Sequence, residues 1–410
     1  MERNEIRALL LNCLHEEAGR VSAADLRQLS AADWRTLRVL AIKKRVGPLL
    51  YARLTERGLD HAVAPDVMER LHKQYEHISL QTLRLYAEIN KLARMVHDDD
   101  VPIILLKGAY LAAEVYGNIA LREMNDLDIL VRRRDLAKVG DALVALGYTP
   151  QRSYRLSELS VGLHLPRYVN PGAAAFEVHW NITPSDLHYS IDTKDLWERA
   201  VPATIAGVAV LGLSPEDLLL HVVMHTTYQH FFVMGLRPFC DVAAVVRRFG
   251  DAIEWGAVRQ RAEQWGWRRG TYLALRLAKE LVGAAVPEAI LHDLRPADFD
   301  EAILAIAREQ AFTDSVISEA ISPGLAQLRV DSGSLEKAIQ LVKMVFPSPQ
   351  MMAHMYGTPP DSVRTYLYYP VRLKDVLMKR SRSAWRLMRG DQKTVLAADR
   401  NRALWNWLSE

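Results

Sequence analysis

The sequence predicts an α+β fold, in which a small core of strands and helices lies between two helical regions. Three short segments indicate strands: residues 101–106 form an apolar run, and residues 126–131 and 175–180 alternate apolar and polar side chains. Between these segments, apolar residues recur at helical spacing, which indicates helices between the strands. The same spacing dominates before residue 95 and after residue 185. This order of elements predicts an α/β or α+β core at about residues 100–182.

The flanking regions have clear helical signals. In the first, an apolar stripe with one polar member, Thr82, runs through Leu71, Tyr75, Ile78, Leu85 and Ile89. In the second, Ser214-Pro215 opens a helix, and further helices are expected at residues 239–249, 255–283, 300–321 and 335–345. We expect four regions: helical 1–95, the core 96–182, helical 183–345 and a helical tail 346–410.

The composition excludes several classes of protein. The chain has 410 residues, half of them hydrophobic, and a formal net charge of +3. A protein that coats nucleic acid should be far more basic, so no stable nucleic-acid partner is expected. The only two cysteines, Cys13 and Cys240, exclude a disulfide scaffold and fit a reducing compartment. With no targeting signal and no apolar run long enough to span a bilayer, we expect a cytoplasmic protein.

Two aspartates of the second strand indicate a metal site. Asp126 and Asp128 lie two residues apart, on one face of the strand, with about 7 Å between their backbones. Carboxylates held this close face either bulk water, as at an ordinary strand end, or a divalent cation such as Mg²⁺ or Mn²⁺.

The third strand offers one more carboxylate. Glu177 shares a face with His179, and if the two strands are neighbours, Asp126, Asp128 and Glu177 converge. Two bridged metals would then support displacement at phosphorus. A plain surface role for Glu177 and a structural role for His179 remain open.

A turn after the first strand indicates a phosphate site. Gly108 lets the backbone approach a ligand, Lys107 and Arg122 supply positive charge, and the N-terminus of a helix from Ala109 to Tyr116 adds free N–H groups. A nucleoside triphosphate fits between these donors and the metals.

These residues resemble a known family. The run LKG…Y…R-x-M-x-D-x-D-x-L-V with a later GY is similar to the bacterial uncharacterised nucleotidyltransferase family of the DNA-polymerase-β-like superfamily. The resemblance covers roughly residues 75–290. It rests on Leu106, Lys107, Gly108, Tyr116, Arg122, Met124, Asp126, Asp128, Leu130, Val131, Gly147 and Tyr148, on Phe176–Trp180, and more weakly on Leu213–His221, His225, Leu236–Asp241, Ile253 and Trp255.

The resemblance implies a small mixed-sheet nucleotidyltransferase core. It implies Asp126, Asp128 and Glu177 as metal ligands and catalytic carboxylates, with an NTP, expected to be ATP, as co-substrate. The wider superfamily often has Gly-Ser or Gly-Gly where this chain has Gly108-Ala109, so its phosphate grip falls to backbone N–H groups and Lys107.

The expected reaction moves an NMP group to a hydroxyl or phosphate of an unknown acceptor and releases pyrophosphate. The resemblance suggests an acceptor in small-molecule or modified-peptide biosynthesis. A kinase or phosphohydrolase, and a non-catalytic nucleotide-binding or scaffold protein, remain alternatives.

Three further features stay open. His221, His225 and His230 form either a packed polar face or part of a substrate pocket, because Val222 replaces the Glu of a metalloprotease motif. Arg237 and Asp241 are spaced for a helix-surface ion pair or belong to the pocket. Residues 371–390 form a basic amphipathic stretch that either docks on its own protein or contacts an acidic partner or membrane surface.

Overall fold

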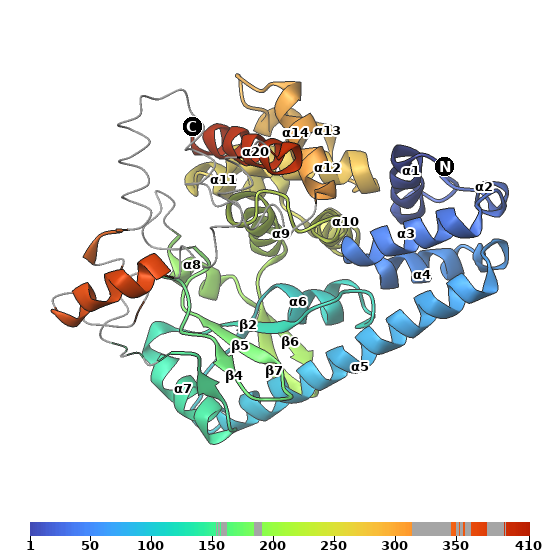
Figure 1. The fold of residues 1–410 in the computed structure, drawn as a ribbon. Coiled ribbons are helices and arrows are strands. Elements are labelled where there is room, and N and C mark those ends of the chain that lie inside the picture. Colours follow the sequence, from blue (N-terminus) through green and yellow to red (C-terminus); the bar gives the residue numbers. More distant parts are fainter. Residues whose placement is uncertain are drawn as a thin grey trace.

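The computed structural model contains a seven-stranded mixed sheet, and helices from both the N-terminal and the C-terminal part of the chain surround it (Figure 1). The structure describes residues 1–152, 162–183, 191–313, 362–374 and 391–410, together with Tyr154, Leu156, 346–349, Met352, Tyr356 and Arg389. The α+β fold expected from the sequence is confirmed. The four expected regional boundaries stay a prediction.

The sheet brings strands from distant parts of the chain together. Its order is β3-β4-β5-β2-β1-β7-β6. The central strand β2 runs antiparallel to β1 and parallel to β5, while β7 pairs parallel with β1. The strands are β1 (Ile104–Leu105), β2 (Asp126–Leu130), β3 (Thr149–Pro150), β4 (Tyr168–Val169), β5 (Ala175–His179), β6 (Val201–Ile205) and β7 (Val208–Gly212).

The hairpin of β6 and β7 differs from the helical character that the sequence predicts for residues 183–345. Ala206 and Gly207 turn the chain with φ angles of 54° and 74°, as a two-residue hairpin turn requires. The Leu211 N–H then donates to the Ile103 carbonyl at 2.8 Å, which joins the hairpin to β1. Alanine at a left-handed turn position is unusual, so the sequence lacks the strong Asn-Gly signal that marks such hairpins.

Helices of the N-terminal region lie along the sheet and beside it. They are α1 (Arg3–Leu14), α2 (Ala23–Arg27), α3 (Ala31–Lys43), α4 (Gly47–Glu56) and α5 (Pro65–Met95). The 31 residues of α5 span about 46 Å, and the helix crosses the sheet from the α4 end to α7 (Leu136–Ala145) (Figure 1). Its buried stripe includes Leu71, Ile78, Thr82, Leu85 and Ile89, as the spacing predicts.

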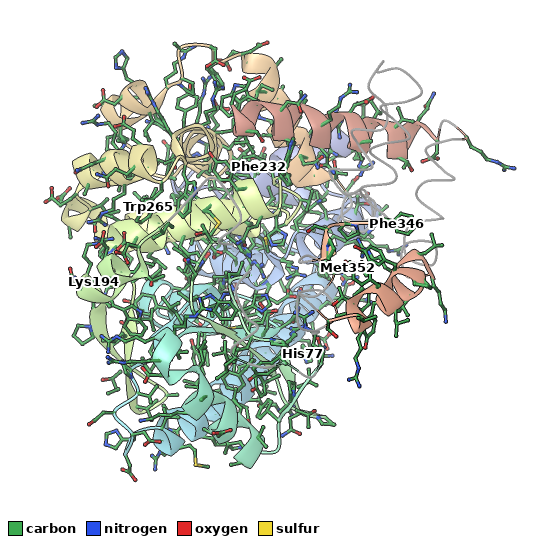
Figure 2. The ribbon with its side chains drawn as sticks, turned by 90° about the vertical axis from the view of Figure 1, so that its left-hand side faces the viewer. His77, Lys194, Phe232, Trp265, Phe346 and Met352 are labelled. Atoms are coloured by element: carbon green, nitrogen blue, oxygen red, sulfur yellow. The ribbon has the colours of Figure 1, made fainter. Side chains whose placement is uncertain are left out.

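Most of the C-terminal helices lie above the sheet in the view of Figure 1. They are α8 (Thr193–Glu198), α9 (Pro215–Met224), α10 (Arg237–Phe249), α11 (Trp255–Gln264), α12 (Arg268–Val282), α13 (Glu288–Leu294), α14 (Glu301–Phe312) and α20 (Gln392–Ser409). Phe232 and Trp265, both buried, lie in this helical half (Figure 2). Within the described ranges, no helix has the length and apolar character needed to cross a membrane.

One expected helix is two helices in the structure. The sequence predicts a single helix over residues 255–283, but the chain breaks at Gly266, which has a φ of 70°. This left-handed residue ends α11, and the Trp267 N–H returns to the Ala262 carbonyl at 2.6 Å. Both segments keep helical periodicity, so the apolar pattern alone does not reveal the turn.

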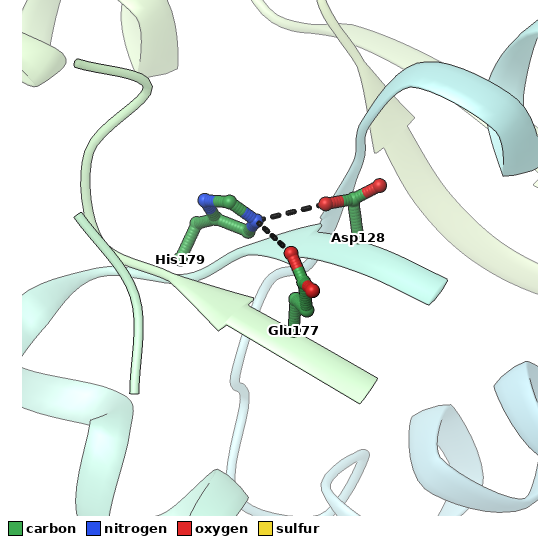
Figure 3. Close-up of side chains that lie close together, drawn as sticks. All are labelled: Asp128, Glu177 and His179. Atoms are coloured by element: carbon green, nitrogen blue, oxygen red, sulfur yellow. Dashed lines mark hydrogen bonds and ion pairs between the residues drawn. The ribbon is translucent and has the colours of Figure 1, made fainter. Parts of the chain in front are cut away.

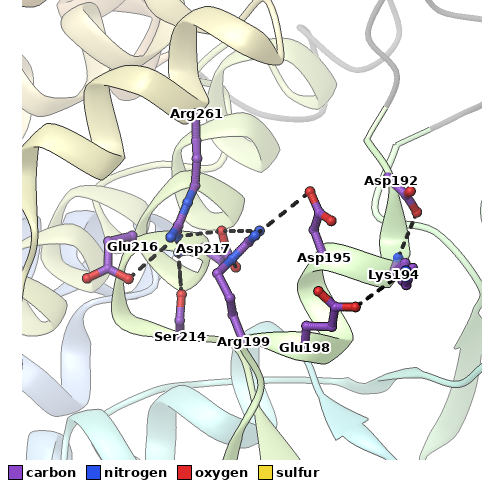
Figure 4. A network of polar contacts seen from close by, with 9 residues as sticks. All are labelled: Asp192, Lys194, Asp195, Glu198, Arg199, Ser214, Glu216, Asp217 and Arg261. Atoms are coloured by element: carbon purple, nitrogen blue, oxygen red, sulfur yellow. Dashed lines mark hydrogen bonds and ion pairs between the residues drawn. The ribbon is translucent and has the colours of Figure 1, made fainter.

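A buried carboxylate connects the sheet to the helical region. Asp217, in the first turn of α9, is fully buried and accepts from Arg199 Nε at 2.8 Å and from Arg261 at 2.9 Å (Figure 4). Arg199 caps the C-terminus of α8, two residues before β6, and Arg261 belongs to α11. The two arginines thus compensate one buried charge and fix the start of α9 to α11 and to the chain that leads into β6.

Two expectations lie largely outside the described residues. Of the basic stretch 371–390, the structure describes only residues 371–374 and Arg389. The helix expected at 335–345, and the part of the 300–321 helix beyond Thr313, are also outside them.

Candidate metal and nucleotide site

Strands β2 and β5 bring two carboxylates to one place. They are parallel, and their register sets Asp128 opposite Glu177 and Asp126 opposite Ala175. Because directly opposed residues of neighbouring strands project from the same face, the Asp128 and Glu177 side chains meet above the sheet. Asp128 is buried and Glu177 is partly exposed.

His179 completes a group of three possible metal ligands. Its Nε2 lies 2.9 Å from Asp128 Oδ1 and 3.8 Å from Glu177 Oε2 (Figure 3). One ligand atom from each of the three residues lies within 4.8 Å of the other two. Two carboxylate oxygens and one imidazole nitrogen form a donor set that suits a divalent cation.

The ionisation of the three residues favours such a cation. Burial lowers the pKa of His179 to about 4, so the ring is neutral and can ligate. Burial, and then the charge of Asp128, raise the pKa of Glu177. Burial also opposes the charge of Asp128, but Lys107 and the His179 hydrogen bond outweigh it and hold the Asp128 pKa well below its usual range. Asp128 is therefore ionised beside a neutral imidazole, and the repulsion between the two carboxylates, which raises the Glu177 pKa, is what a bound cation would relieve.

Asp126 has a different partner. It lines the same cavity, but its Oδ2 accepts from Arg167 at 3.2 Å. Arg167 Nε also lies 3.7 Å from Glu177. Of the three carboxylates expected to converge, Asp128 and Glu177 meet at His179, while Asp126 is held beside them by an arginine.

Lys107 and Gly108 lie at the edge of this group. Lys107 Nζ donates to Asp128 Oδ1 at 3.1 Å, and its backbone has a left-handed φ of 42°. A side chain at Gly108 would place its Cβ 2.5 Å from an Arg122 nitrogen and 3.0 Å from Met124 Cβ. The helix expected over Ala109–Tyr116 begins earlier, at Lys107, and α6 (Lys107–Tyr110) passes into a π-helical turn over Leu111–Val115.

Arg122 is held from behind by Asp241 of α10. Its Nε and one terminal nitrogen donate to the two Asp241 oxygens at 3.3 and 3.1 Å, and Tyr116 donates to the same carboxylate at 2.9 Å. The ion pair is buried, and the other terminal nitrogen of Arg122 lies against Gly108. Of the two interpretations left open for Arg237 and Asp241, the surface ion pair is wrong, because both residues are buried and Asp241 pairs with Arg122. Arg237 instead lines the cavity, as the other interpretation predicts.

A cavity of about 740 Å³ joins these groups to the helical region. On one side it is lined by Lys107, Gly108, Arg122, Asp126, Asp128, Glu177 and His179, and on the other by residues that include Arg45, His225, His230, Arg237 and Trp267. The His225 and His230 rings lie 4.5 Å apart. His221 is buried in α9, and burial lowers its pKa to about 3.

Comparison with protein families finds one matching family. A family model described as uncharacterised nucleotidyltransferase matches residues 30–283. The chain belongs to this family. The matched part extends from before α3 to the end of α12 and includes every residue of the site described above. No curated protein and no solved structure matches the chain.

One cationic residue of this nucleotidyltransferase cavity, Arg45, escaped the sequence analysis. It lies in the turn between α3 and α4, far from the Asp-x-Asp segment in the sequence, and no local motif surrounds it. Its only signal is spatial, since the fold brings it to the wall opposite the carboxylates. Arg237, by contrast, was expected either in a surface ion pair with Asp241 or in the pocket.

Proposed function

We propose that this chain is a Mg²⁺- or Mn²⁺-dependent nucleotidyltransferase of the DNA-polymerase-β-like kind. It moves an NMP group from an NTP, with ATP the expected donor, to a hydroxyl or phosphate of an acceptor, and pyrophosphate leaves. The single observation that carries the proposal is the group of Asp128, Glu177 and His179, within 4.8 Å of one another, at the edge of a large cavity. The family match supports nucleotidyl transfer.

Asp128, Glu177 and His179 would hold a divalent cation, and Asp126 would contribute once Arg167 releases it. The donor set fits, because it combines two carboxylates with an imidazole that is neutral at ordinary pH. A bound cation neutralises phosphate charge and polarises the α-phosphate. Lys107, whose ammonium now balances Asp128, is positioned to move to a phosphate oxygen when a cation takes its place.

The triphosphate would lie against the Lys107-Gly108 turn. Gly108 leaves room for close approach, and Arg122 presents one nitrogen there while Asp241 holds the other two. An arginine fixed in this way binds phosphate without first losing side-chain freedom. Ala109 has no hydroxyl that could bind phosphate, and the positioned guanidinium of Arg122 would supply a phosphate donor in its place.

The acceptor would enter from the helical side of the cavity. Its hydroxyl oxygen attacks the α-phosphorus, the bond to the pyrophosphate oxygen breaks, and the hydroxyl proton passes to Glu177. Glu177 has two oxygens, so one can accept this proton while the other holds the cation. We propose a cytoplasmic setting in small-molecule or modified-peptide biosynthesis; the buried, unpaired Cys13 and Cys240 support a reducing compartment.

Product analysis tests the proposal. Each of the four common NTPs is incubated with the full chain and Mg²⁺ or Mn²⁺, with water or added alcohols as acceptor. Pyrophosphate and NMP products are expected from the wild type and not from Asp126→Ala/Asp128→Ala. Asp141→Asn, an exposed carboxylate on α7, is the matched control. ADP or orthophosphate as product would instead support the kinase or phosphohydrolase alternative, and equal activity in wild type and double variant would refute the proposal.

A further inference from the structure

The charges that line the cavity are not balanced. Five arginine and lysine side chains line it. Three of them have carboxylate partners: Lys107 pairs with Asp128, Arg122 with Asp241, and Arg167 with Asp126. Among the described residues, Arg45 and Arg237 have no ion pair, although both face a cavity in a part of the protein that is otherwise densely paired.

Arg237 is buried without a counter-charge. Its side chain is at the start of α10, the residue is only 6% exposed, and one terminal nitrogen donates to the Glu123 carbonyl at 2.9 Å. Its Nε has no hydrogen-bond partner in the described part of the chain. Burial, and then the charge of Arg122, lower the Arg237 pKa to about 9. A buried, incompletely bonded guanidinium is costly unless an anion completes it.

His230 adjoins the same two arginines. It follows the π-helical turn His225–Gln229 and lines the cavity with them. Burial, and then the charges of Lys107, Arg237 and Arg45, lower its pKa to about 4. The neutral ring can donate one N–H to an anion without adding to the charge repulsion.

The backbone around these residues is strained and tightly packed. Six non-glycine residues in the described ranges have positive φ, and four of them are Arg45, Lys107, Phe231 and Phe232, at or directly beside the cavity. Gly235, with a φ of 83°, packs so closely that a Cβ there would lie 3.0 Å from the Lys44 backbone. The turn that carries Arg45 and the loop between His230 and Arg237 are therefore locked together before any ligand binds, and strain of this kind concentrates at functional sites.

We propose that Arg45, Arg237 and His230 form an anion-binding subsite on the helical wall of the cavity, which receives a phosphate-type oxyanion of a reactant. Two arginines offer forked donors that match phosphate oxygens, and the histidine adds a neutral donor. The oxyanion belongs either to the terminal phosphates of the NTP or to a phosphate on the acceptor. Its assignment to a reactant depends on the proposed nucleotidyl transfer, whereas the subsite itself does not.

Calorimetric titration of the full chain with inorganic pyrophosphate, in EDTA, tests the subsite directly. Arg45→Asn removes the charge and keeps a residue that tolerates left-handed φ, and Arg237→Gln removes the buried charge. We expect each to weaken pyrophosphate binding roughly 10- to 100-fold, as expected when hydrogen bonds to a charged group are lost. Arg35→Gln on α3 and Arg248→Gln on α10, both exposed and outside the cavity, should leave the affinity unchanged. Thermal unfolding checks that each variant is folded.

The outcomes separate the subsite from the proposed reaction. No pyrophosphate binding by the wild type, or equal affinity in folded Arg45→Asn, overturns the subsite. If pyrophosphate binding depends on Arg45 but the chain releases no pyrophosphate from any NTP, the subsite is supported and the proposed nucleotidyl transfer is refuted. With the wild type saturated by a non-hydrolysable NTP analogue, loss of pyrophosphate binding assigns the subsite to the NTP. Persistent binding of inorganic phosphate assigns it to the acceptor.

Discussion

Asp128 and Glu177 face each other across two parallel strands, and His179 Nε2 approaches both carboxylates, at 2.9 and 3.8 Å. The relationship is set by strand register, because a shift of one residue along β5 would turn Glu177 and His179 to the opposite face of the sheet. The metal site proposed here depends on that register, and the following predictions depend on the site and its surroundings.

Asp128→Asn should weaken Mn²⁺ binding more than Asp126→Asn does. Asp128 belongs to the group of three ligands, whereas Asp126 must first leave Arg167. We expect a loss of roughly 10- to 100-fold for Asp128→Asn and a smaller one for Asp126→Asn, measured by calorimetry with Asp141→Asn as control. The reverse order would show that Asp126 is the principal ligand.

His179 should determine which metal the enzyme prefers. An imidazole nitrogen is a better ligand for Mn²⁺ than for Mg²⁺, which favours oxygen donors. His179→Asp should therefore raise the ratio of Mg²⁺- to Mn²⁺-supported pyrophosphate release, and His179→Gln should lower activity with Mn²⁺ most. An unchanged ratio in His179→Asp would mean that the ring does not ligate.

Gly108→Ala should impair nucleotide binding while the protein stays folded. The new methyl group would lie 2.5 Å from an Arg122 nitrogen, so the guanidinium must move away from the phosphate turn. We expect KM for NTP to rise about tenfold or more, as when a charged hydrogen bond is lost. Gly256→Ala, where nothing lies within 4 Å of the new Cβ, is the matched control. Equal KM values in the two variants would exclude a phosphate role for this turn.

The buried Arg122–Asp241 pair should matter for stability as well as for binding. Asp241→Asn leaves a guanidinium buried without its counter-charge, which costs about 3–5 kcal/mol of unfolding free energy. Arg259→Gln breaks an exposed pair with Glu263 and should cost only about 0.3–0.5 kcal/mol. Urea denaturation measures both, and similar losses for the two variants would contradict a tight buried pair.

His221 should make the protein less stable in acid. Burial lowers its pKa from 6.5 to about 3, so between these values the unfolded chain binds a proton that the native chain does not. The stabilisation is fully present above pH 6.5 and is lost as the pH falls toward 3, by about 1.4 kcal/mol per pH unit. His221→Gln should remove this contribution to the dependence of the unfolding free energy on pH between pH 5 and 6.5. His292→Gln, at an exposed position, should leave that dependence unchanged. Parallel curves for wild type and His221→Gln would refute the assignment.

The sequence predicts the local parts of the site well. Alternation in two short segments is enough to set Asp126 with Asp128 and Glu177 with His179, because strand periodicity is a local property. The register that selects Asp128 and Glu177 as partners is not local, and neither is the pairing of Asp126 with Arg167.

Other features escape prediction for the same reason. The β6–β7 hairpin turns at Ala206-Gly207 without the usual turn residues, and Arg45 and Arg237 reach the cavity only through the packing of helices distant in the sequence. A single sequence contains the periodicity of each helix, but not the tertiary contacts that bring these two arginines to the cavity beside Asp128, Glu177 and His179.

The central claim is that Asp128, Glu177 and His179 hold a divalent cation beside a bound nucleotide. Electron spin echo spectroscopy of Mn²⁺ with a non-hydrolysable NTP analogue tests it most directly. We predict a ¹⁴N coupling and a ³¹P coupling in the wild type, with the ¹⁴N coupling lost and the ³¹P coupling retained in His179→Gln. A bound Mn²⁺ whose ¹⁴N coupling persists in His179→Gln, or that couples to neither nucleus in the wild type, would contradict the proposed site.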